Sequence, residues 1–75
     1  MNKQRRKQIA AAMELIEQAQ AILEEVIAEE QEAFDNLPES LQTSERGELM
    51  EEYIYTLESF QDGLDTSELQ EIVDG

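Results

Sequence analysis

Carboxylates are the only side chains in this 75-residue chain that could do chemistry and are both numerous and regularly spaced. Asp and Glu number 19, and Lys and Arg together number five, so the formal net charge is −14. A pair of carboxylates catalyses acid–base chemistry when enclosed surroundings shift its pKa values. These acids fall on the polar sides of predicted helices, where no pocket is implied. We therefore predict a protein that is not an enzyme and has no catalytic residues.

Other kinds of reactive site lack their residues. The absence of Cys and His removes the usual zinc ligands, disulfides and Cys or His nucleophile systems. Residues 62–68 resemble a calcium loop only superficially, since the alternating oxygen ligands are missing and the Gly is misplaced. No Gly-rich phosphate loop is present. We predict no metal and no cofactor.

The acids themselves form rows at helical spacing. Residues one helical turn apart lie about 5–6 Å apart, which is close to the phosphate spacing along one nucleic-acid strand. Such a row can occupy a cationic groove built for DNA or RNA and be steered to it by charge. The alternative is that the acids only keep exposed helices in solution. The predicted partner-binding residues are Glu14, Glu17, Glu24, Glu25, Glu48, Glu51, Glu52 and Glu58, with Tyr55 as an aromatic anchor.

One long helix, residues 4–33, must position the first acidic row. Its apolar residues follow a heptad pattern typical of a coiled coil, and no Gly or Pro interrupts it. Pro38 cannot continue the helix and ends it. The predicted inner rows are Ile9, Ile16 and Leu23, and, offset by three, Ala12, Ala19, Val26 and Ala33. They are widened by Met13, Leu15, Ile22 and Ile27.

Two further helices complete the predicted fold. The second, residues 45–61, carries an apolar stripe from Leu49 to Phe60 and begins after the cap candidates Thr43 and Ser44. Gly47 weakens its first turn, or allows a close approach to the turn at 36–41. Gly63 is predicted to close it in a Schellman motif with Leu64. A short third helix, residues 66–73, starts at a capping box between Asp65 and Glu68.

The predicted architecture is an all-α helical hairpin. A basic segment, residues 1–8, carries +4 and precedes a single helical domain, residues 9–75, which carries −18. Antiparallel pairing of two copies would place Lys3–Lys7 beside the partner's acids at 24–32, so we predict a homodimer. Its seam is predicted at Ile9, Ile16, Leu23 and Val26. The alternative is a compact monomeric three-helix hairpin, in which the basic segment is a solvated tail.

Residues 29–42 and 44–48 contain the pattern DNLPE-x-L-Q-x-S-E-R-G-E. This stretch resembles a turn found in small acidic helical proteins of tailed bacteriophages. The resemblance covers about residues 25–60. It implies that the chain comes from a phage, but it identifies no functional residues. A phage context favours an inhibitor of a host nucleic-acid enzyme or defence system.

These observations predict a small acidic, phage-type binding protein, a DNA mimic that blocks a host protein with a basic surface. Direct nucleic-acid binding is not expected, because a body of −18 repels phosphate. Membrane binding is not expected either, because the polar faces are acidic. The alternatives are a structural or adaptor homo-oligomer and an antitoxin-like partner. The predicted location is the cytoplasm, that of an infected bacterium if a phage encodes the chain.

Overall fold

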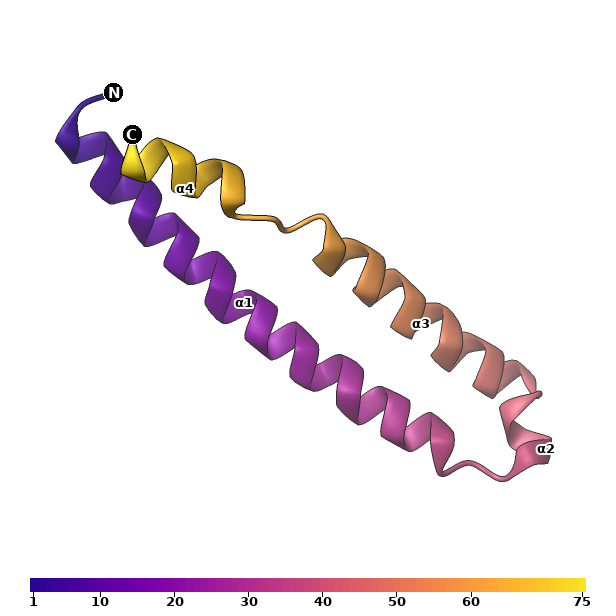
Figure 1. The fold of residues 1–75 in the computed structure, drawn as a ribbon. Helices are drawn as coiled ribbons and strands as arrows, with labels where there is room; N and C mark the ends of the chain where they lie inside the picture. Colours follow the sequence, from indigo (N-terminus) through magenta and orange to yellow (C-terminus); the bar gives the residue numbers. More distant parts are fainter.

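The computed structural model describes all 75 residues as helices and short connections, without strands. The helices are α1 (Lys3–Asp35), α2 (Glu39–Gln42), α3 (Glu45–Asp62) and α4 (Ser67–Asp74). After the turn at α2, α3 and then α4 return antiparallel along α1, so the two chain ends meet (Figure 1). The molecule measures 58 × 15 × 13 Å. The predicted all-α hairpin is confirmed, and its helix boundaries differ from the predicted ones by one or two residues.

Local hydrogen bonds explain where α1 begins and ends. The Asn2 side chain caps α1 by accepting a bond of 2.9 Å from the Arg5 backbone N–H. At the other end, the Asn36 N–H donates to the Glu32 carbonyl at 3.0 Å. Pro38 follows two residues later, where its ring excludes further helix. Both ends of this 33-residue helix are therefore fixed by their own sequence.

The turn between α1 and α3 is held by two polar side chains. The Gln42 amide donates to the backbone carbonyls of Phe34 and Leu37, at 3.2 Å each. The Ser44 hydroxyl caps α3 by accepting from the Gly47 N–H at 3.4 Å. The prediction that Ser44 caps the second helix is confirmed. Because carbonyls at the end of α1 receive these bonds, the direction in which α3 leaves is fixed.

Gly47 lies where α3 passes closest to α2. A Cβ added at Gly47 would meet the Gln42 carbonyl group and would lie 2.6 Å from the Leu41 carbonyl oxygen. These are backbone atoms, which cannot rotate away. The predicted close approach to the preceding turn is confirmed, and it explains a buried glycine in the first turn of a helix.

We expect Gly47→Ala to destabilise the protein by about 1–3 kcal/mol, because overpacking against backbone forces the helix to shift. The matched control is Gly63→Ala, where the added Cβ lies 3.4 Å from the Phe60 carbonyl oxygen, an ordinary contact. That control should be neutral or slightly stabilising, because alanine reduces the freedom of the unfolded chain. Urea unfolding followed by circular dichroism measures both. Equal stabilities for the two variants would contradict the role given to Gly47.

The side of α1 that packs on α3 and α4 is identified by its burial. One predicted inner row, Ile9, Ile16 and Leu23, is half-buried there. The other predicted row is wrong, because its members are exposed. Larger side chains one position further along the chain lie inside instead, since they bury more apolar area. The observed second row is Met13, Gln20, Ile27 and Phe34.

The core is a single thin seam. Met13 of α1 and Ile54 of α3 are its only buried hydrophobic side chains. Half-buried Met50 and Leu57 extend the seam along α3, and Leu69 and Val73 continue it along α4. Two helical layers thus share one line of contact, and no third layer covers them.

The junction between α3 and α4 differs from the predicted motifs. Gly63 has φ −80°, so the predicted Schellman motif, which requires left-handed backbone, does not form. Instead, the Gln20 amide of α1 donates to the Leu64 carbonyl and ties the junction down. The Asp65 side chain accepts a bond of 2.9 Å from the Ser67 N–H and starts α4 without the predicted capping box. The Ser67 backbone N–H and hydroxyl lower the pKa of the Asp65 carboxyl.

Candidate acidic interaction surface

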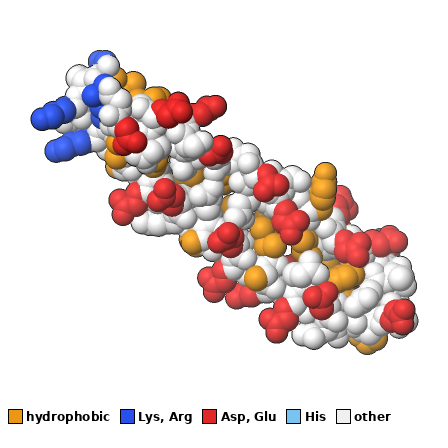
Figure 2. Space-filling model, viewed as in Figure 1, with side chains coloured by type: hydrophobic (Ala, Val, Ile, Leu, Met, Phe, Trp, Pro, Cys, Tyr) orange, Lys and Arg blue, Asp and Glu red, His pale blue; other side chains and the backbone are white.

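Carboxylates cover much of the molecule, and the basic side chains gather at the end that holds the N-terminus (Figure 2). Three open grooves between the helices collect carboxylates into local groups, and a fourth is mainly apolar. We call the side that bears the three acidic grooves the acidic face. Its residues are Glu14, Glu17, Glu24, Glu51, Tyr55, Glu58 and Asp62.

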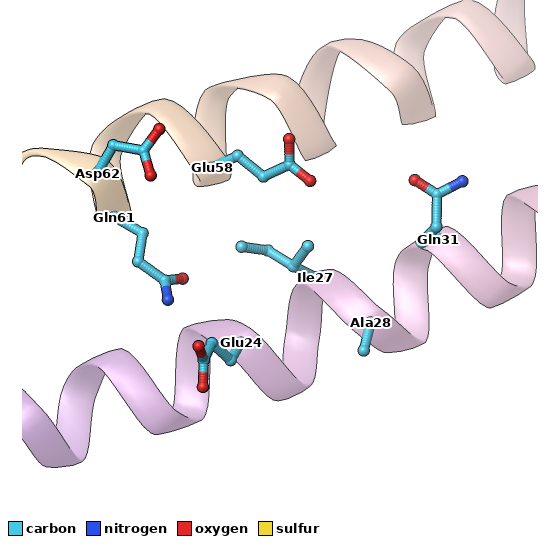
Figure 3. Close-up of a pocket in the computed structure, with 7 residues that line it drawn as sticks. All are labelled: Glu24, Ile27, Ala28, Gln31, Glu58, Gln61 and Asp62. Carbon is cyan, nitrogen blue, oxygen red and sulfur yellow. The ribbon is translucent and has the colours of Figure 1, made fainter.

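The central groove has a volume of about 340 Å³ and lies between the middle of α1 and the end of α3. Glu24 extends from α1, and Glu58 and Asp62 extend from α3, on either side of an apolar floor (Figure 3). Ile27 and Ala28 form that floor. Three carboxylates over an apolar floor match a long cationic side chain, whose stem is apolar and whose tip is charged.

Two amides also line the central groove. Gln31 lies at one end, and Gln61 reaches from α3 toward α1 (Figure 3). The Gln61 Oε1 atom is buried and has no hydrogen-bond partner. Every group around it that carries a charge is a carboxylate, which can accept hydrogen bonds but not donate them when ionised. The groove is therefore rich in acceptors and short of donors.

The acidic face continues beyond this groove in both directions. Gln31 and Glu58 also line the next groove, which adds Glu51 and Tyr55 near the turn. The Tyr55 side chain is 72% exposed, so its ring projects from the acidic face without support from the core. Toward the chain ends, Glu14 and Glu17 line a separate groove beside α4, with Gln70 and Val73.

The structure brings together some of the predicted partner-binding residues and separates others. All nine are exposed. Six of them, Glu14, Glu17, Glu24, Glu51, Tyr55 and Glu58, line the three grooves of the acidic face. Glu25, Glu48 and Glu52 line no groove and point away from the α1–α3 junction, as their positions on the helices require.

Three polar residues of the central groove were not predicted as partner-binding residues. Asp62 lies one helical turn after Glu58, and that spacing could have identified it. Gln31 and Gln61 are uncharged, and only the pairing of α1 with α3 makes them neighbours. No signal within either helix alone could have found them.

The carboxylates and the exposed Tyr55 ring of the acidic face can bind cationic groups. No group of three or more carboxylates is arranged to hold a metal ion. None of the helices combines the length and apolarity needed to cross a membrane. No family model, curated protein or solved structure matches the chain.

Repulsion within the central groove yields a stability prediction. Glu58 and Asp62 are four residues apart on α3, and such a pair of like charges destabilises a helix by about 0.2–0.5 kcal/mol. We expect Glu58→Gln to raise the free energy of unfolding by about that amount, which corresponds to an increase of about 1–4 °C in Tm. Thermal unfolding at low salt measures the change.

The matched control is Glu45→Gln, which removes the same charge from the first turn of α3. A carboxylate at that position interacts favourably with the helix dipole, so this variant should lose stability. If both variants gained equally, general repulsion and not the groove would be the cause.

Proposed function

We propose that the protein binds another protein through the acidic face and blocks a basic surface that otherwise holds nucleic acid. The central groove is the observation that supports this proposal most directly. An Arg or Lys side chain of the partner would lay its stem on Ile27 and bring its charged tip between Glu24 and Glu58. A guanidinium supplies only donors, which complements a groove that is rich in acceptors.

The layout of the carboxylates supports a partner that binds nucleic acid. Glu17 and Glu24 are seven residues apart on one side of α1, about 10 Å along its axis. Glu58 and Asp62 continue the row on α3, and Tyr55 adds an aromatic ring within it. A surface built to bind a line of phosphates presents a matching line of cations. Charge attraction at long range would speed the encounter.

The resemblance of the turn to phage proteins favours a host target. On this proposal the chain acts in the cytoplasm of an infected bacterium, as an inhibitor of a nucleic-acid enzyme or a defence protein. Inhibition requires no catalysis by the inhibitor. It requires only that the acidic face and the nucleic acid compete for one surface.

The test begins with capture of the partner from a bacterial lysate and purification of the captured protein. Its affinity for the acidic protein is then measured at about 50 mM and about 500 mM salt, because the screening lengths at these two concentrations differ about threefold. Affinity should fall steeply at the higher salt. Double-stranded DNA should also displace the acidic protein from its partner. Binding that is insensitive to both salt and DNA would reject the proposal.

Charge reversal tests the central groove. The triple variant Glu24→Lys, Glu58→Lys, Asp62→Lys should weaken binding at least about a hundredfold, because it places like charges against the partner's cations. The control is Glu25→Lys, Glu32→Lys, Glu52→Lys, which changes the net charge equally at exposed residues that line no groove. The control should mainly slow association. Equal losses in the two variants would show that the groove has no special role.

A second candidate function is a structural or adaptor homo-oligomer, and the exposed apolar side chains on the other side of the hairpin favour it. It predicts that activity survives charge reversal and is lost when those apolar side chains are replaced. An antitoxin-like role predicts a toxin gene beside this one.

A further inference from the structure

The side of the hairpin opposite the acidic face is apolar and open. Val26 of α1 and Tyr53 of α3 line a groove of about 450 Å³ on that side, together with Glu30, Thr56 and Leu57. Helical spacing places other large side chains beside these two. We call this side the apolar face. Its large residues and their exposed fractions are Leu15 (66%), Ile22 (62%), Val26 (42%), Leu49 (43%), Tyr53 (54%) and Phe60 (61%).

The elongated hairpin exposes more surface than a compact protein of its mass, enough to supply an interface. The chain exposes 5865 Å², whereas a compact protein of 8.6 kDa exposes about 4,700 Å². Its radius of gyration is 17.6 Å, against about 11 Å for a compact domain of this length. The excess of about 1,200 Å² exceeds the roughly 800 Å² that each partner buries in a stable complex.

We propose that the apolar face binds a second copy of this chain, with the two α1 helices antiparallel about a two-fold axis at Ala19. Ala19 is the midpoint of α1, since Lys3 and Asp35 are each 16 positions away. It also lies in the apolar stripe of α1. That stripe contains Ala12, Leu15, Ala19, Ile22 and Val26.

Charge complementarity identifies the second copy as the partner and sets its direction. At 3.6 residues per turn, Arg5 flanks the stripe at one end, and Glu29 and Glu30 flank it at the other. Arg5 lies about 21 Å from Ala19 along the helix, and the acidic pair lies about 15–17 Å away. An antiparallel partner therefore brings opposite charges together at both ends. A parallel partner would bring like charges together.

The proposed dimer interface differs from the dimer seam predicted from the sequence. Ile9, Ile16 and Leu23 are half-buried within the chain, so they are occupied by α3 and α4 of the same molecule. Of the four residues predicted for the dimer seam, Val26 remains in the proposed dimer interface. The same two-fold axis places Tyr53 and Phe60 of one protomer toward α4 of its partner, where Ile72 is 37% exposed. The two hairpins together would form a two-layered helical bundle, with one hairpin in each layer.

Light scattering at micromolar concentration should give twice the 8.6 kDa mass of one chain. Ile22→Glu should raise the dimer Kd at least about tenfold, because it buries an unpaired charge in the seam. The matched control is Ala21→Glu, an exposed neighbour on the same helix that points away from the apolar face. Circular dichroism should show that both variants keep their helices. A wild-type mass of one chain, or an Ile22→Glu variant that dimerises as tightly as the control, would overturn the proposal.

Direction can be tested with single cysteines, because the chain has none of its own. With a short bis-maleimide, Ala19→Cys should cross-link to itself, since the axis passes through it. Ala12→Cys and Val26→Cys should cross-link efficiently only when the two variants are mixed. Equal self-linking at all three positions would show a parallel dimer and overturn the antiparallel arrangement. The Lys variants of the acidic face should remain dimers, so this proposal and the proposed function can fail separately.

Discussion

The structure depends on one seam, in which half-buried side chains of α1 meet those of α3 and α4. Only Met13 and Ile54 are buried hydrophobic side chains, so each contact in the seam carries a large share of the stability. The seam also brings acids of different helices close together, because it determines which residues of α1 and α3 face the same groove. Gly47 and Gln42 act at the turn by fixing the angle at which α3 starts along α1. Gln20 acts at the other end by holding the junction before α4.

The helices could be predicted from the sequence, but their rotation could not. Capping residues, Pro38 and heptad spacing are local signals, and they located α1, α3 and α4 to within two residues. The inner rows of α1 were ambiguous because its apolar band is about half a turn wide. The row that contains Val26 is offset by three residues from the row that contains Ile16, and the row that contains Ile27 is offset by four. Both offsets complete a heptad pattern, so a single helix offers no basis for choosing between the two rows. The choice depends on volume, since Met13, Ile27 and Phe34 fill the space opposite α3 better than alanines do.

The candidate site was likewise predictable within each helix and unpredictable between helices. Acidic rows were visible on each helix, and six of the nine predicted residues line the grooves of the acidic face. The central groove itself is a product of two helices, so the meeting of Glu24 with Glu58 required the observed register. Gln61 is the clearest example, because no sequence pattern predicts that its Oε1 atom is buried without a hydrogen-bond partner. Gly63 is the opposite case, because a local signal predicted a left-handed cap, whereas the glycine has φ −80°.

The two proposed surfaces are compatible because the hairpin has only two broad sides. A protomer that covers the apolar face with its own copy leaves its acidic face free. The two-fold axis would then direct two acidic faces outward in a fixed relation. A nucleic-acid-binding partner often offers more than one basic site, and two linked acidic faces would raise its effective affinity without any new contact. Dimerisation would also add the buried apolar area that the thin seam lacks, which offsets the repulsion among the carboxylates. The same charges that weaken the isolated hairpin would therefore be tolerated in the dimer and favourable in its complex.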